Sequence, residues 1–230
     1  MTVKIRFKRT DSGRNLGKVH RENNNMARLR IILVMFALLG FSFGTGCTGQ
    51  PLKSLAKIES QLESPPFSNA LLTDLENYVK HRDPFVRAQA IIVIANTAKR
   101  YPNELSSYAL PVFIECLKDK DVAPRREAAI GLKSLGAYSA PKAKEIADEL
   151  LKNPDSDIAY FLAKTIENIP DQSRITLPIL IKYTNRYPPK AGSFPDFNQD
   201  VYKTFLYIRD YANTNNRINK GSVPIIDEAL

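Results

Sequence analysis

Cysteine and histidine are scarce in this chain of 230 residues, which contains only Cys47, Cys116, His20 and His81. A zinc site needs three or four nitrogen, sulfur or oxygen ligands that converge on one point, and no cysteine or histidine pair here stands at ligand spacing. Glycine-rich phosphate loops, nucleophile elbows and paired catalytic carboxylates are also missing. The sequence therefore predicts a protein with no metal, no cofactor and no catalytic residues.

Most of the chain also lacks an excess of positive charge. The formal charge of the whole chain is +9, but residues 1–46 hold 9 Lys and Arg against 2 acidic residues, so +7 lies there and +2 belongs to the rest. Basic and acidic residues are interleaved along that remainder, whereas binding to a phosphate backbone needs a one-sided basic stripe. We therefore expect no nucleic-acid partner.

The most apolar stretch is too short to span a bilayer. Residues 31–43 (IILVMFALLGFSF) form a run of 13 uncharged residues, fewer than the ~20 that a transmembrane helix needs. Basic residues precede this run, and the small residues Gly44, Thr45 and Gly46 follow it, directly before Cys47. This order predicts a signal peptide at residues 26–46 that sends the rest of the chain out of the cytoplasm.

The segment from Gly44 to Cys47 resembles the lipobox of bacterial lipoproteins, in which small residues precede a cysteine that is lipidated and becomes the mature N-terminus. Gly44 stands where that family usually carries leucine. The resemblance implies a lipid on Cys47, attachment to a membrane, and a location in the cell envelope facing the periplasm or the exterior. An uncleaved signal anchor and an ordinary signal peptide cleaved nearby remain alternatives, and both also place the folded part outside the cytoplasm.

Two polar segments flank the signal peptide. Residues 1–25 are rich in Arg, Lys and Asn and are unlike the start of a signal peptide, so we hypothesise that Met26 is the true start. Residues 47–66 are polar with scattered apolar positions, which favours a tether followed by a short amphipathic stretch that ends at a double proline. The folded domain is then expected at residues 67–230.

An internal repeat runs through this domain. Residues 83–94 align without gaps with residues 121–132, at a shift of 38, and a weaker third copy occupies residues 155–166. Each copy lies on the second of two helical patterns, and paired helices at this period form a solenoid. We predict first helices at 69–80, 108–118, 141–152 and 173–187, and a last helix at about 199–212. Aspartates in the turns, such as Asp83 and Asp121, are expected to cap the second helices.

An aspartate in the turn, an arginine four residues later and a small residue three further on resemble the HEAT repeat, including the short HEAT-like repeats of phycobilisome lyases. The resemblance covers about residues 69–169. It implies an all-α fold, a short right-handed superhelix of three to four helix pairs. In that family the aspartate and arginine form a ladder between neighbouring repeats, which Ala159 interrupts in the third copy. The corresponding positions are Asp83, Arg87, Asp121, Arg125 and Asp155.

The C-terminal part, from about residue 185, departs from the repeat. A proline-rich loop interrupts it, and we expect an atypical cap because a terminal repeat has no neighbour on one side. Aromatic residues gather here, and such residues are frequent anchors of protein interfaces. They either bury the cap's own loop or form a partner surface, which would comprise Phe194, Phe197, Tyr202, Tyr207 and Tyr211.

Three functions are compatible with this pattern. The first is a non-catalytic, lipid-anchored scaffold that binds an unknown protein partner in the cell envelope. The second, taken only from the resemblance of the repeats, is a phycobilisome-lyase-like protein with a role in chromophore attachment in the cytoplasm, which the export signal opposes. The third is a substrate-binding or folding factor for exported proteins, which needs a groove with exposed apolar residues. Cys116 lies in an apolar helical run and is expected to be a buried, inert thiol.

Overall fold

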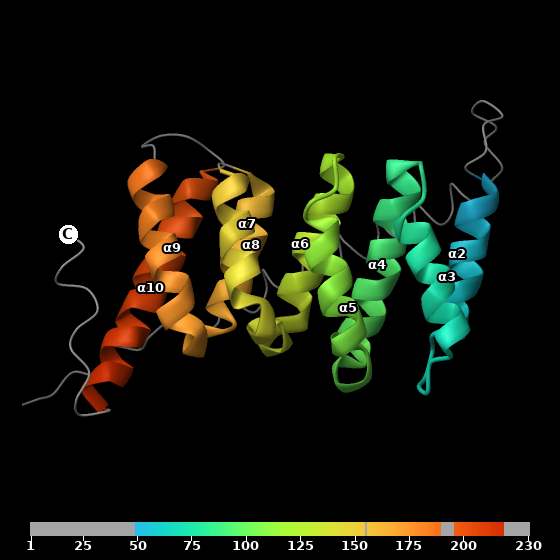
Figure 1. The fold of residues 1–230 in the computed structure, drawn as a ribbon, viewed down its shortest axis with the longest axis horizontal. Coiled ribbons are helices and arrows are strands. Elements are labelled where there is room, and N and C mark those ends of the chain that lie inside the picture. Colours follow the sequence, from blue (N-terminus) through green and yellow to red (C-terminus); the bar gives the residue numbers. More distant parts are fainter. Residues whose placement is uncertain (1–48, 155, 190–195, 219–230) are drawn as a thin grey trace, which may run out of the picture. The chain divides into compact units, whose positions relative to one another are not determined.

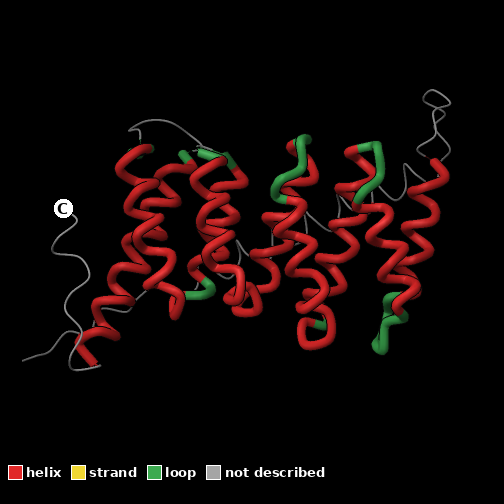
Figure 2. Tube along the Cα trace, viewed as in Figure 1, coloured by secondary structure: helices red, strands yellow, loops and turns green. Residues whose placement is uncertain are grey.

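The computed structural model describes residues 49–154, 156–189 and 196–218. In these ranges all regular structure is helical (Figure 2), so the predicted all-α solenoid is confirmed. The helices are α2 (Gly49–Gln61), α3 (Asn69–Val79), α4 (Pro84–Arg100), α5 (Pro102–Cys116), α6 (Val122–Leu135), α7 (Ala143–Lys152), α8 (Asp157–Glu167), α9 (Ser173–Arg186) and α10 (Phe197–Ile218). Two 3-10 helices, η1 (Gly136–Lys142) and η2 (Pro170–Gln172), precede α7 and α9.

The helices form two layers. In one layer α2, α4, α6, α8 and α10 pack side by side in that order, and α3, α5, α7 and α9 pack against them in the other layer (Figure 1). Successive helices run in opposite directions because short connections join them. All even-numbered helices therefore begin at the same edge of the array, which we call the turn edge. The α3–α4 and α5–α6 turns lie on this edge, beside the start of α2.

The turns explain where the second helices begin. Asp83 has an extended backbone, its Oδ1 accepts a hydrogen bond of 2.9 Å from the N–H of Phe85, and Pro84 occupies the first helical position. This cap satisfies one of the free N–H groups at the start of α4. Asp121 precedes α6 at the equivalent position, but its side chain makes no capping hydrogen bond. The predicted cap is wrong there because an arginine of the neighbouring repeat binds that carboxylate, as described below.

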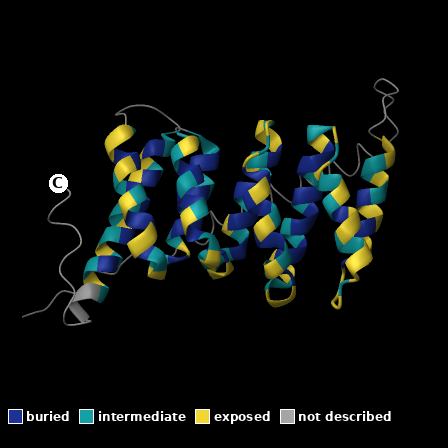
Figure 3. Ribbon diagram, in the orientation of Figure 1, coloured by how far each residue is buried: buried dark blue, intermediate teal, exposed yellow. Residues whose placement is uncertain are grey.

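The hydrophobic core lies between the two layers and contains residues of every α-helix from α2 to α10. Buried residues occur on the helices of both layers (Figure 3). In α4, Ile91 and Ile94 are completely buried, as expected for a helix that is apolar nearly all round. Gly131 in α6 faces the ring of Phe113 in α5, and a β-carbon added there would lie 2.7 Å from its Cζ atom. The glycine therefore permits a close approach that no side chain could allow.

The N-terminal boundary of the folded domain differs from our expectation. We predicted a tether at residues 47–66, but residues 49–61 form α2, which packs against α3 and α4. Its apolar residues Leu55 and Ile58 are 2% and 6% exposed, and Leu62, which directly follows the helix, is 1% exposed. The scattered apolar positions are spaced to lie on one face of a helix, and this face covers the open side of α4. Helix α2 thus takes the place of a second helix of a preceding repeat.

The C-terminal end is closed by α10. Val201, Thr204, Ile208 and Ala212 form its buried face, and they pack on α8 and α9. The buried Tyr183 of α9 donates a hydrogen bond of 2.8 Å from its hydroxyl to Oδ1 of Asn198. We placed this helix at about 199–212, and it extends further in both directions. Similarly, α5 begins at Pro102, six residues before the predicted start, because Pro102 suits the first turn of a helix.

Candidate functional site

The first two repeats are joined by an ion pair centred on Arg87. Its Nε atom donates a hydrogen bond of 2.7 Å to Oδ2 of Asp119, and its Nη2 atom donates one of 2.7 Å to Oδ1 of the same carboxylate. Nη2 donates a second hydrogen bond, of 2.6 Å, to Oδ2 of Asp121. The Nη1 atom donates to the carbonyl oxygens of His81 and Arg82. All five N–H donors of the guanidinium are therefore engaged. This arrangement fixes α4 to the turn that precedes α6.

The pair is largely shielded from solvent, since the side chains of Arg87 and Asp119 are 8% and 14% exposed. Burial of Asp119 opposes its ionisation and is the largest single influence on it. Three influences act against burial: the hydrogen bond from Arg87, the hydrogen bond from the N–H of Asp121, and nearby positive charge. Together they outweigh burial, so the pKa of Asp119 falls below its usual value. The hydrogen bond to Asp119 raises the pKa of Arg87. Both groups are thus held in their charged forms.

The second repeat uses a different arrangement. Arg125 donates from Nη1 to the carbonyl oxygens of Asp119 and Lys120, which reproduces the backbone contacts of Arg87. The contact to the next repeat comes from the neighbouring Arg126, whose Nε lies 2.5 Å from Oδ2 of Asp157 in α8. These side chains are 50% and 33% exposed. Of the residues predicted for the ladder, the structure therefore brings together Arg87 and Asp121, whereas Asp83 serves as a cap and Asp155 lies outside the described residues.

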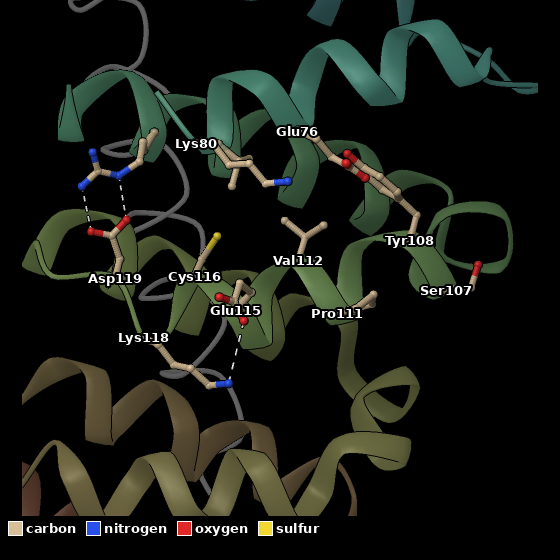
Figure 4. A pocket seen from close by; sticks show the side chains of 12 residues that line it. Glu76, Lys80, Ser107, Tyr108, Pro111, Val112, Glu115, Cys116, Lys118 and Asp119 are labelled. Carbon is tan, nitrogen blue, oxygen red and sulfur yellow. Dashed lines mark hydrogen bonds and ion pairs between the residues drawn. The ribbon is translucent and has the colours of Figure 1, made fainter. Parts of the chain in front are cut away.

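A cleft opens next to the Arg87 ion pair, between α3 and α5 (Figure 4). It has a volume of about 630 Å³. Val79, Pro111 and Val112 supply apolar walls, and the hydroxyl of Tyr108 donates a hydrogen bond of 3.0 Å to the carbonyl oxygen of Leu72. The charged residues around it carry both signs and are Glu76, Lys80, Glu115 and Lys118. Sequence reasoning missed this cleft because it depends on how far α3 and α5 stand apart.

Cys116 lines the same cleft but is not suited to nucleophilic chemistry. The residue is 6% exposed, and burial, followed by the charges of Asp119 and Glu115, raises the pKa of its thiol to about 12. A cysteine nucleophile needs a lowered pKa and an accessible sulfur atom. The Nδ1 atom of His81 is engaged in the turn, since it accepts a hydrogen bond of 3.1 Å from the N–H of Asp83. Neither residue forms part of a catalytic pair.

The aromatic residues of α10 do not share one face. Tyr202 and Tyr207 are 38% and 49% exposed, but they are five positions apart in the chain, so they point about 140° apart around the helix. Tyr202 packs beside Phe205, whereas the Tyr211 hydroxyl is hydrogen-bonded to Asp171 of η2. Phe197 is partly buried at the start of α10, and Phe194 lies outside the described residues. A partner surface made of these aromatics stays a prediction.

The described helices offer neither a metal-binding group nor a membrane span. Among these residues no group of three or more His, Cys, Asp or Glu could hold a metal ion, and no helix is long and apolar enough to cross a membrane. Every buried side-chain nitrogen or oxygen in this part of the chain has a hydrogen-bond partner. The predicted lipobox (Gly44, Thr45 and Gly46) and Cys47 lie outside the described residues.

Comparison with known proteins agrees with this architecture. Residues 72–167 match the family model of HEAT repeats, which supports a place for the chain in the HEAT-repeat family. The match begins within α3 and ends with α8, so it spans the three helix pairs in which the repeat was detected. No curated protein matches the chain. HEAT-repeat arrays are typically non-catalytic scaffolds that bind other proteins, and repeat arrays of this kind offer extended binding surfaces.

Proposed function

We propose that this protein is a lipid-anchored scaffold of the bacterial cell envelope that binds a protein partner and catalyses no reaction. The observation that carries this proposal is the order of elements along the chain: a signal-like segment, a lipobox-like Gly44–Cys47, and then an array of helix pairs. A lipid on Cys47 would hold the array at a membrane. The array itself offers an extended surface for binding a protein.

The cleft between α3 and α5 is the surface that best suits a protein partner. Its apolar walls, including Val79 and Val112, could take up an apolar side chain, and its charged residues of both signs suit a polypeptide better than a polyanion. Protein interfaces commonly combine an apolar centre with a polar rim. The partner expected here presents a large apolar or aromatic residue flanked by acidic and basic groups.

Site-specific photocrosslinking in cells tests this proposal. A photoreactive phenylalanine replaces Val112 in the cleft, and the matched control replaces Ile175 on α9, which is 42% exposed and does not line the cleft. We expect a discrete crosslinked protein in the membrane fraction for position 112 and none for position 175. Crosslinks at both positions, or at neither, would contradict a partner site in the cleft.

The anchor is tested by Cys47→Ser in the same cells. We expect labelled fatty acid to be incorporated into the unsubstituted protein and not into the variant. Incorporation into neither would contradict the lipoprotein proposal. A soluble, cytoplasmic chain would instead favour the phycobilisome-lyase-like alternative.

A further inference from the structure

We infer that the turn edge, at the starts of α4 and α6, contacts an anionic membrane surface. This contact holds the domain in one orientation relative to the bilayer. This inference rests on the proposed function, because it takes Cys47 as the point of attachment. It adds a second contact with the membrane and names the residues that make it. The partner is the lipid headgroup region, a surface of negatively charged phosphates above an apolar interior.

The first argument is the length of chain between the anchor and the domain. Only Thr48 separates Cys47 from Gly49, where α2 begins. Successive Cα atoms are 3.8 Å apart, so the Cα of Cys47 lies no more than about 8 Å from that of Gly49. Helix α2 is fixed to the array through Leu55 and Ile58, which are 2% and 6% exposed. An anchor at Cys47 therefore brings the start of α2 to the membrane.

The second argument is the direction of the helices. Because the even-numbered helices run parallel, the starts of α4 and α6 face the same way as the start of α2 (Figure 1). Packed helices lie about 8–10 Å apart, so both starts stand within roughly 20 Å of the start of α2. The α3–α4 and α5–α6 turns thus come to the bilayer together with the anchor.

The third argument is the composition of these two turns. The α3–α4 turn (residues 80–83) carries the exposed bases Lys80 and Arg82 at its first and third positions. The α5–α6 turn carries Lys118 and Lys120 at the positions related by the repeat shift of 38. The side chains of Lys80, Arg82 and Lys120 make no ion pair within the described part of the chain, and Lys118 has only a loose contact of 3.8 Å with Glu115. Each base near an anionic leaflet strengthens association about fivefold.

Two exposed apolar side chains accompany the bases. Phe85, in the first turn of α4, is 48% exposed, and Val122, the first residue of α6, is 57% exposed. Apolar residues next to bases are the composition of surfaces that lie in the membrane interface. Of the three acidic residues in these turns, Asp119 and Asp121 bind Arg87, and Asp83 caps α4 through the N–H of Phe85. The two carboxylates that bind Arg87 therefore do not repel an anionic surface as free charges would.

The third turn, further from the anchor, lacks this composition. Between α7 and α8 the chain carries Asn153, Pro154 and Ser156, and Asp157 begins α8. Lys152 occupies the position equivalent to Lys80 and Lys118 but is paired with Glu149 at 2.6 Å. Of these three turns, only the two nearest to Cys47 combine exposed bases that lack a close ion pair with exposed apolar residues, as expected if these two turns meet the membrane.

The experiment uses the protein purified from membranes and reconstituted into vesicles of phosphatidylcholine and phosphatidylglycerol. An environment-sensitive fluorophore is attached to Phe85→Cys, and in a matched protein to Lys99→Cys at the opposite end of the same helix. Cys116 is buried, and the unsubstituted protein controls for any label that it takes up. We expect the emission at position 85 to shift to shorter wavelength and to be quenched by lipids that carry a nitroxide at the headgroup, and neither effect at position 99.

Charge reversal supplies the second variant. Lys80→Glu with Arg82→Glu should abolish the quenching at position 85, whereas the same reversal at Lys99 and Arg100, which are exposed at the far end of α4, should leave it unchanged. Equal quenching at positions 85 and 99, or none at either on a lipidated protein, would overturn the orientation but leave the anchor intact. An intact mass without lipid on Cys47 would instead refute the proposed function, so the two failures are distinguishable.

Discussion

Arg87 holds both carboxylate oxygens of Asp119 through two hydrogen bonds of 2.7 Å, and the two residues are 32 positions apart in the chain. This paired geometry is the strongest form of Arg–carboxylate contact. It fixes the distance between the first two repeats at the turn edge, which also carries the proposed membrane contact. The ion pair is thus the contact on which the spacing of α4 and α6 depends at that edge.

Removal of Arg87 should destabilise the protein strongly. Arg87→Ala leaves the largely buried carboxylate of Asp119 without its positively charged partner, and breaking a buried pair in this way costs about 3 to 5 kcal/mol of unfolding free energy. The matched control is Arg126→Ala, whose ion pair with Asp157 is half exposed and should contribute no more than about 1 kcal/mol. Urea unfolding followed by circular dichroism measures both, and equal losses would contradict the role given to Arg87.

The same pair predicts a pH dependence in acid. The pKa of Asp119 is lower in the folded state than the value of about 3.9 expected in the unfolded chain. Its contribution to stability is therefore complete above pH 5 and is lost as the pH falls through the folded pKa. Asp119→Asn should be less stable at neutral pH, and its stability should fall less steeply below pH 4. Parallel curves for the two proteins would contradict this assignment.

The close contact of Gly131 with Phe113 predicts an unusual result for a helical glycine. Alanine normally stabilises a helix relative to glycine by about 1 kcal/mol, but a β-carbon at position 131 would lie within 3 Å of three atoms of a fully buried ring. Gly131→Ala should therefore cost about 1 to 3 kcal/mol through overpacking. Phe113→Leu in the same chain should relieve part of that cost. A stabilising Gly131→Ala would show that α5 and α6 lie further apart than described.

The assignment of α2 to the folded domain is also testable. Leu55→Ala should lower the unfolding free energy by about 2 to 5 kcal/mol, because it leaves a cavity between α2 and α4. Lys57→Ala, on the exposed face of α2, should change it by no more than about 0.5 kcal/mol. Thermal unfolding of the two variants compares them directly. An unchanged transition for Leu55→Ala would mean that this segment is a tether after all.

Features that depend on local sequence pattern could be predicted, whereas features that depend on how the helices pack could not. The repeat shift of 38 residues located the helix pairs, because it follows from sequence periodicity, and the resemblance to the HEAT repeat implied a contact between Arg87 and Asp121. Asp119 was missed, since its repeat equivalent is His81 and only the folded geometry brings it to Arg87. The amphipathic pattern of residues 49–61 was visible, but its burial depends on the open face of α4. The cleft beside Cys116 likewise depends on the separation of α3 and α5, which no local pattern encodes.

The lipid on Cys47 is the central claim, and the intact mass of the native protein tests it most directly. The protein would be extracted from isolated membranes with detergent, and its mass and N-terminal peptide determined. We predict a chain that begins at Cys47 and carries a diacylglyceryl group, with no residue from the signal peptide remaining. A soluble, unmodified chain that begins at Met1 or Met26 would contradict the account.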